Sequence, residues 1–261
     1  MTILIASSDR VSLETTPCQL PVSRVDIAGQ NMVEATRWLI VGAGGFGREV
    51  FSWTSGQLRA TLSCCPVGFL DDDPKSLAQF PSLKERWAGP ISTYLPQHGD
   101  RLLMAIGDPT SKLAVGDALR ARGAVFASFV HPTAVIAHDV HIGVGCIICP
   151  FAVVCCNVRF GDFVSMNVGS VAGHDSIIGD GCTLSPHSDV AGQVSLKRGV
   201  FVGCQTAILP KTQIGEFARI GAGSVVINHV SPGASMMGVP AKRISWSQQD
   251  PDFDQPELMA G

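Results

Sequence analysis

The feature that most constrains the fold is a six-residue repeat that runs from Val135 to Val230. Neither the 3.6-residue period of a helix nor the two-residue period of a strand produces a repeat of six. A fixed short period is typical of a stacked solenoid. The first register is apolar throughout, at Ile136, Ile142, Ile148, Val154, Phe160, Met166, Ala172, Ile178, Leu184, Val190, Leu196, Val202, Ile208, Ile214, Ile220 and Val226. The second register, four residues after each, is small or β-branched and uncharged, from Val140 to Val230.

Strand geometry explains a period of six. Each hexad supplies a short strand and a turn, and three hexads close one triangular coil of a parallel β-helix, so the array predicts about five coils. The large apolar residue is expected inside the coil, and the small residue is expected where the chain bends. Glycines near the apolar position are expected at corners that need unusual backbone angles; they are Gly143, Gly161, Gly179, Gly203, Gly215 and Gly221.

The array resembles the left-handed β-helix of the hexapeptide-repeat acyltransferases. The closing segment Gly238-Val-Pro-Ala-Lys-Arg243 resembles the segment that follows that helix in the family. The resemblance implies a homotrimer whose active sites lie between adjacent helices.

Composition restricts the partners and the setting. A net charge of −3 and a pI near 6.1 provide no basic field for nucleic acid. No apolar run approaches the length of a membrane span. Nine cysteines, an odd number, are scattered or fall on repeat positions, which favours a reducing cytoplasm over a disulfide framework.

Four regions follow from these patterns. Residues 1–36 show no sustained periodicity, and we expect a poorly ordered extension. Residues 37–130 are expected to form an α/β domain, and residues 131–244 the β-helix. Residues 245–261 form a short acidic tail.

The α/β domain begins with a glycine-rich turn. Trp38–Val41 is an apolar strand that leads into Gly42-Ala-Gly-Gly-Phe-Gly47 and then a predicted helix. This order matches the fingerprint in which backbone N–H groups approach a phosphate at a helix N-terminus. A second strand ends at Asp71 and Asp72, and a third ends at Gly107. The unit is too short for a complete dinucleotide fold, so a half-Rossmann domain that binds a nucleotide is expected rather than NAD chemistry.

The combination resembles one bacterial family over roughly residues 37–244. The family contains the sialic-acid O-acetyltransferases and the N-acetyltransferases of nucleotide-linked amino sugars. The resemblance implies that the nucleotide-sugar acceptor is held by Gly44, Gly45, Phe46, Asp71, Asp72 and Gly107. Phe46 stands where the family often has histidine.

The segment Asn167-Val-Gly-Ser-Val-Ala-Gly-His174-Asp175 resembles the catalytic segment of that family. By this resemblance His174 is the general base, Asp175 raises its basicity, and Asn167 orients the ring. The chemistry is consistent, because imidazole titrates near neutral pH and an adjacent carboxylate stabilises its protonated form.

The resemblance also implies contacts with the acyl donor, acetyl-CoA, at Thr183, Gly192, Cys204 and Ala222. The backbone N–H of Gly192 would face the thioester oxygen. Thr183 replaces a second histidine of the sugar N-acetyltransferases, and a histidine occurs instead at His187.

A metal site is not expected. Cys146-x-x-Cys149 has a zinc-like spacing, but Cys146 belongs to the small inward register, where cysteine acts as a small hydrophobe. The resemblance implies an acetyl-CoA-dependent acetyltransferase of polysaccharide biosynthesis that acts on an amino or hydroxyl group of a nucleotide-linked sugar. The alternatives are an O-acetyltransferase of a free sugar or polysaccharide, a γ-class carbonic anhydrase with zinc, and a non-catalytic scaffold.

Overall fold

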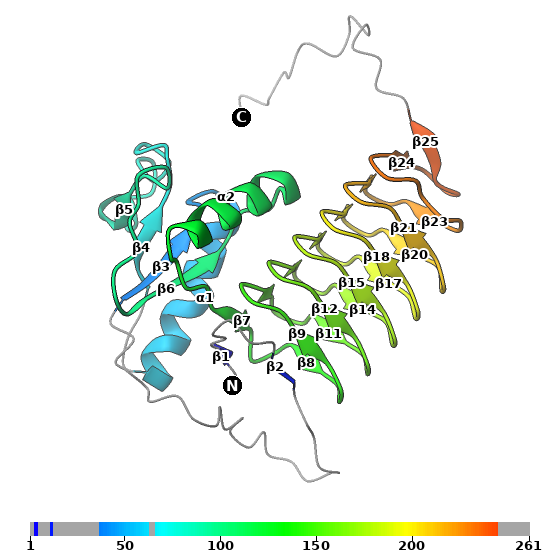
Figure 1. The fold of residues 1–261 in the computed structure, drawn as a ribbon, viewed down its shortest axis with the longest axis horizontal. Coiled ribbons are helices and arrows are strands. Elements are labelled where there is room, and N and C mark those ends of the chain that lie inside the picture. The colour runs from blue at the N-terminus through cyan, green and yellow to red at the C-terminus, as the bar shows by residue number, and fades with distance from the viewer. Residues whose placement is uncertain (1–2, 5–10, 13–36, 63–65, 245–261) are drawn as a thin grey trace, which may run out of the picture.

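The protein consists of a small α/β domain and a β-helix (Figure 1). The computed structural model describes residues 3–4, 11–12, 37–62 and 66–244. The rest of the predicted extension and the predicted acidic tail lie outside the described residues.

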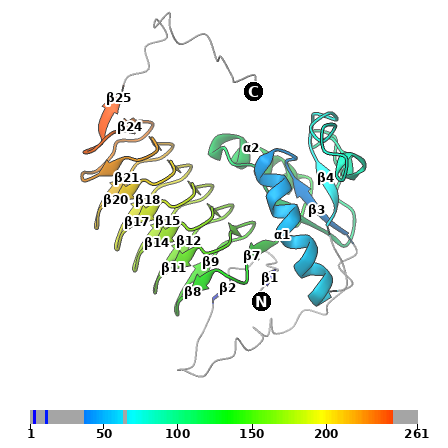
Figure 2. The ribbon, with the colours of Figure 1, turned by 180° about the vertical axis from the view of Figure 1, so that it is seen from behind.

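The N-terminal domain is a four-stranded parallel sheet between two helices. Its strands are β3 (Arg37–Val41), β4 (Pro66–Leu70), β5 (Trp87–Gly89) and β6 (Asp100–Met104), in the order β5-β4-β3-β6. Helix α1 (Gly45–Leu62) and helix α2 (Pro109–Ala121) cover opposite faces, and a short 3₁₀ helix, η1 (Lys84–Arg86), precedes β5 (Figure 2). Successive residues of a strand point to opposite faces. Accordingly, Trp38 and Ile40 pack in one apolar cluster, and Leu39 and Val41 pack in the other.

The second domain is the predicted left-handed parallel β-helix. Strand β7 (Ser128–Val130) leads into two-residue strands at each hexad, which stack on three sheets. The first sheet contains β10 (Ile147–Ile148), β13 (Ser165–Met166), β16 (Thr183–Leu184), β19 (Phe201–Val202) and β22 (Arg219–Ile220). The second contains β8 (Val135–Ile136), β11 (Val153–Val154), β14 (Val171–Ala172), β17 (Asp189–Val190), β20 (Ala207–Ile208) and β23 (Val225–Val226). The third contains β9 (His141–Ile142), β12 (Arg159–Phe160), β15 (Ile177–Ile178), β18 (Ser195–Leu196) and β21 (Gln213–Ile214).

Additional strands extend the sheets at both ends of the helix. Strand β24 (Ser235–Met237) continues the first sheet, and β25 (Lys242–Ile244) folds back antiparallel to it. At the other end β1 (Ile3–Leu4) pairs with β7, and β2 (Val11–Ser12) pairs with β9. These strands occupy hydrogen-bonding edges that an open solenoid would otherwise expose.

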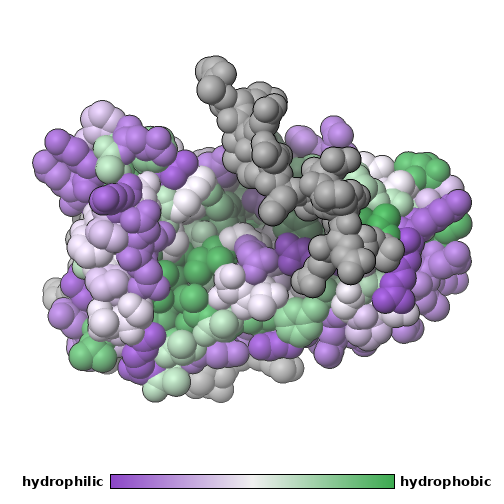
Figure 3. All heavy atoms as spheres, turned by 90° about the horizontal axis from the view of Figure 1, so that it is seen from above, coloured by the Kyte–Doolittle hydropathy of each residue, from purple (hydrophilic) through white to green (hydrophobic). Residues whose placement is uncertain are grey.

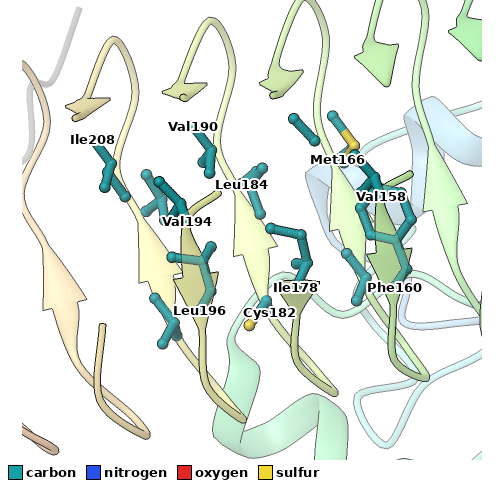
Figure 4. Packing of buried hydrophobic residues seen from close by; sticks show 14 of the residues in the cluster. Val158, Phe160, Met166, Ile178, Cys182, Leu184, Val190, Val194, Leu196 and Ile208 are labelled. Atoms are coloured by element: carbon teal, nitrogen blue, oxygen red, sulfur yellow. The ribbon is translucent and has the colours of Figure 1, made fainter. Parts of the chain in front are cut away.

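The two predicted registers form the core. All positions of the first register are buried except Ile136, which is partly buried and packs against the same cluster. Every position of the second register is buried as well. Figure 4 shows the large side chains, among them Ile178, Leu184 and Leu196, meeting inside the coils.

The prediction for the corner glycines is wrong. The left-handed backbone conformation falls instead on one residue per hexad two positions further along, at Asp139, Gly145, Phe151, Asn157, Phe163, Gly169, Asp175, Gly181, His187, Gln193, Gly199, Gln205, Lys211, Phe217 and Gly223. A Cβ on Gly143 would lie 2.2 Å from the carbonyl oxygen of Gly161, and a Cβ on Gly161 would lie 2.1 Å from Oδ1 of Asp180. These glycines therefore permit close stacking of coils, which explains their position without unusual backbone angles.

A buried lysine joins the two domains. Lys112 of α2 donates from Nζ to Ser165 Oγ (2.9 Å), to Thr183 Oγ1 (2.8 Å) and to the carbonyl oxygen of Cys182 (3.3 Å). Thr183 Oγ1 in turn donates to the carbonyl oxygen of Gly107, at 2.8 Å. Burial lowers the pKa of Lys112 to about 8, because none of these partners carries a formal negative charge to offset the lost hydration.

Two neighbouring isoleucines of β15 test the inward register. Ile178→Ala should lower the free energy of unfolding by about 2–4 kcal/mol, because it removes a buried side chain and leaves a cavity. Ile177→Ala is the matched control, since Ile177 is 52% exposed and should cost less than about 0.5 kcal/mol. Denaturant titration measures both; equal costs would contradict the register.

Lys112→Met tests the domain contact through pH. The folded-state pKa lies below the ordinary value of 10.5, so the unfolded chain binds more protons between about pH 8 and 10.5. The unfolding free energy of the wild type should therefore rise relative to that of Lys112→Met across this interval. Denaturation at a series of pH values measures the difference, and a difference independent of pH would contradict the burial of a titrating lysine.

Candidate active site

The structure brings His174 and Asp175 together at an exposed corner of the β-helix. Both follow β14, where the chain turns from the second sheet to the third. His174 Nδ1 lies 2.7 Å from Asp175 Oδ2, and the side chains are 57% and 44% exposed. Asp175 adopts φ of 60°, in the left-handed region that aspartate tolerates better than most residues.

This contact determines which ring nitrogen can accept a proton. An ionised carboxylate only accepts hydrogen bonds, so Nδ1 carries the hydrogen in the neutral ring and Nε2 is the free base. Nε2 lies over Gly192 of the next coil, where a Cβ would come within 2.4 Å of it. Within the described residues, no acceptor is recorded for the Gly192 N–H. A proton acceptor and a backbone donor therefore lie next to each other.

Asn157 is a residue of this site that the sequence analysis missed. Its Nδ2 donates to Asp175 Oδ1 at 3.0 Å from one coil earlier, a separation of 18 residues. The hydrogen bonds from His174 and then from Asn157 hold the pKa of the Asp175 carboxyl below its usual value. The signal that could have found it is the coil length, since three hexads place 157 and 175 in one column.

Asn167 does not orient the ring. It follows β13 of the first sheet and lies at a different corner from His174. Its Nδ2 donates to the carbonyl oxygen of Leu184, at 3.1 Å. A separation of about one hexad moves a residue to another face of the triangle, so Asn167 does not reach the His174 ring of its own chain.

The predicted acyl-donor residues do not meet in one chain. Thr183 is buried against the N-terminal domain, and its hydroxyl is already bonded to Lys112 and Gly107. Cys204 and Ala222 are exposed at the corner between the first and second sheets. His174 and Gly192 lie at the next corner, so the second sheet separates the two groups.

The outward face of that second sheet is mostly apolar. Apart from buried Gly173, the residues along it are partly or largely exposed, with Val135 at 59%, Leu209 at 42% and Ile227 at 47%. Two columns make up this face: Val135, Val153, Val171, Asp189, Ala207 and Val225, and Ala137, Cys155, Gly173, Ala191, Leu209 and Ile227. The third sheet presents mainly polar side chains, and the first is covered by the N-terminal domain over its early coils.

The predicted nucleotide residues gather at the carboxyl edge of the N-terminal sheet. Gly44 and Gly45 are exposed where α1 begins after β3, and Gly107 follows the neighbouring strand β6. Such an edge, where the connections leave in opposite directions, is where ligands bind in α/β sheets. Seen from above, the surface is hollowed between the two domains, with apolar side chains along the hollow (Figure 3).

The other members of the nucleotide set have partners within the domain. Asp71 holds the glycine turn, since Oδ2 accepts from the N–H of Ala43 (2.7 Å) and Oδ1 from that of Asp73 (2.9 Å). Asp72 is exposed and accepts from the N–H of Ser92, at 2.8 Å. Phe46 is half-buried against the core.

The histidine, cysteine and acidic side chains of the described residues form no group of three placed to hold a metal ion. No described helix combines the length and the apolar character needed to cross a bilayer.

Sequence comparison finds serine acetyltransferases. The enzyme of Haemophilus influenzae is 37% identical over 67 residues, which is 25% of this chain and 25% of that enzyme. The enzyme of Mycobacterium tuberculosis is 28% identical over 192 residues, 69% of each chain. The chain thus spans about a quarter of the length of the first curated relatives it matches. No protein-family model matches it.

Structure comparison extends the likeness to both domains. PerB from Caulobacter crescentus, in complex with CoA and GDP-perosamine, is 29% identical, covers 80% of this chain and 97% of its own, and has a TM-score of 0.71. WeeI from Acinetobacter baumannii is 25% identical, with coverages of 80% and 99% and a TM-score of 0.69. The acetyltransferase domain of PglB from Neisseria gonorrhoeae, at 22% identity and a TM-score of 0.68, shares the fold. In its repeats and its two-domain architecture, this chain is therefore similar to hexapeptide-repeat acetyltransferases.

Proposed function

We propose that this protein transfers an acetyl group from acetyl-CoA to an amino or hydroxyl group of a nucleotide-linked sugar. The observation that carries the proposal is the base Nε2 of His174, held by Asp175 through Nδ1 and placed against the backbone of Gly192. The likeness to PerB, whose complex contains CoA and GDP-perosamine, supports the choice of substrates.

In the proposed reaction His174 Nε2 removes a proton from the acceptor as its nitrogen or oxygen attacks the thioester carbonyl. The Gly192 N–H donates to the carbonyl oxygen as negative charge develops there. The carbon–sulfur bond then breaks, and the proton passes from His174 to the departing thiolate of coenzyme A. Asp175 stabilises the charged ring between these two steps.

The acceptor would bind through its nucleotide at the carboxyl edge of the N-terminal sheet. Gly44 and Gly45 expose backbone at the start of α1, where N–H groups and the helix dipole favour a phosphate. Gly107 faces this edge from β6, and exposed Asp72 is placed to meet the ribose or base. Asp71 would act indirectly, by holding the turn.

The positions of the two corners support an assembly of several copies, and we propose a homotrimer. His174 and the Cys204–Ala222 column lie on opposite sides of the apolar second sheet. Packing of that sheet against a second copy would bury its valines and leucine. It would also bring the His174 corner of one chain close to the Cys204–Ala222 corner of its neighbour. The base of one chain would then face the donor groove and the nucleotide domain contributed by its neighbours.

His174→Ala tests the mechanism. It should lower turnover by about 10² to 10⁴, the usual contribution of a general base, without unfolding the protein, because the ring is exposed. His138→Ala is the control, since His138 also lies beside an aspartate in the same register but is given no catalytic role. Steady-state kinetics measure both; near-normal turnover of His174→Ala would refute the mechanism.

Asp175→Asn tests the role of the charge. The substitution keeps a residue that tolerates the left-handed conformation but removes the negative charge beside the ring. Turnover should fall, because the protonated ring loses the carboxylate that stabilises it during the reaction, but it should fall less than for His174→Ala. Steady-state kinetics measure the change, and unchanged turnover would show that the carboxylate does not act on the base.

Val153→Glu tests the assembly. A charge in the apolar second sheet should dissociate the trimer and abolish activity, because it must be desolvated at the interface. Ser195→Glu on the polar third sheet is the matched control and should leave the trimer intact. Light scattering measures the mass, and a fully active wild-type monomer would contradict the proposal.

Asp72→Ala tests the nucleotide edge. It should weaken the binding of the nucleotide sugar and leave the binding of coenzyme A unchanged. Thermal stability reports each ligand separately, since a ligand at a hundred times its dissociation constant adds about 2.7 kcal/mol. Equal loss of both ligands would indicate misfolding, and no loss would place the acceptor elsewhere.

A further inference from the structure

The β-helix carries the same histidine–aspartate pair twice. His138 Nδ1 lies 2.8 Å from Asp139 Oδ2, and His174 Nδ1 lies 2.7 Å from Asp175 Oδ2. The two pairs stand in one column, two coils apart, and the aspartates share the left-handed conformation, with φ of 56° and 60°. The pair by itself therefore does not define a catalytic site.

The two pairs differ in the residues that the preceding and following coils place next to them. The coil after His174 presents Gly192 under Nε2, whereas the coil after His138 presents the side chain of Cys156 in the same column. The coil before Asp175 presents Asn157, whose amide bonds to the carboxylate. Asp139 belongs to the first coil, and no described side chain bonds to its carboxylate other than His138.

The left-handed backbone conformation at position 157 does not require an asparagine side chain. This residue has φ of 60°, which asparagine tolerates well, but glycine occupies the equivalent position in other hexads, as at Gly145 and Gly169. The left-handed corner is thus compatible with no side chain at all. The amide instead makes a specific bond to the one carboxylate that faces the proposed base.

We propose that Asn157 is a positioning residue for His174, acting through Asp175. Its Nδ2–H holds Oδ1, so that the other oxygen, Oδ2, stays on Nδ1–H and the free lone pair stays on Nε2. At this exposed corner, an Asp175 side chain without the bond from Asn157 would also populate other rotamers, in which its carboxylate no longer accepts from Nδ1 of His174. The inference rests on the proposed function, because it assigns Nε2 as the base.

The decisive variant is Asn157→Gly, which removes the amide and keeps the left-handed backbone unstrained. Turnover should fall about threefold to tenfold, corresponding to one hydrogen bond, while the KM for acetyl-CoA stays unchanged. In an Asp175→Gly background the same substitution should cost nothing further, because its partner is gone. An equal loss in both backgrounds, or no loss in the first, would overturn the proposal.

A spectroscopic readout separates this inference from the proposed function. In protein labelled with ¹⁵N at its seven histidines, the ring shifts report the tautomer of His174 without any acceptor sugar, with His174→Ala providing the assignment. Asn157→Gly should increase the Nε2–H tautomer of His174 and leave His138 unaltered. An unchanged tautomer would overturn the positioning role. If the tautomer shifts but His174→Ala retains turnover, the positioning role stands and the proposed function fails.

Discussion

The hydrogen-bond ladder between coils is the constraint on which this structure depends. Each short strand away from the ends of the helix bonds to the strands 18 residues before and after it. Side chains with that separation therefore stack in columns, with successive members about 4.8 Å apart. A column can be apolar and inward, such as the one with Ile178, or outward and reactive, such as the one with His174. The ladder holds Asn157, Asp175 and Gly192 beside their partners without any long-range loop. The geometry of the proposed catalytic site is therefore a property of coil stacking.

The N-terminal domain depends on the same ladder. Its contact with the helix uses side chains that point outward from the first sheet, with Ser165 and Thr183 in one column bonding to Lys112. Phe163, in the left-handed corner position, packs so closely on α2 that a Cβ on Gly116 would lie 2.6 Å from its ring. An ion pair between Arg120 and Asp162 joins the next turn of α2 to the corner, at 2.9 Å. The domain thus docks onto a regular surface whose spacing the coils determine.

The sequence predicts the fold well because one pattern repeats many times. Sixteen apolar positions such as Leu184 reinforce one another, and the half-Rossmann strands are marked by the glycines that end them. The pair of His174 and Asp175 is adjacent in sequence, so it too can be predicted. Asn157 and Asn167 show where prediction from sequence stops. Residues 18 apart, such as Asn157 and Asp175, lie in one column, whereas residues seven apart, such as Asn167 and His174, lie at different corners. Lys112 gives no signal in sequence, because its partners arise only when two independently patterned domains dock.

The chain of bonds from Lys112 through Thr183 to Gly107 has a consequence for substrate choice. A hinge motion between the domains would break the hydrogen bonds of Lys112 and Thr183, so this contact favours one arrangement of the two domains. In the proposed trimer, such an arrangement would give one value to the distance between the proposed nucleotide edge and the proposed general base. The proposed acceptor would then have to span that distance with its own length. Selectivity would then come from a molecular ruler, in which the number of bonds between the nucleotide and the acetylated atom matters as much as the identity of the sugar.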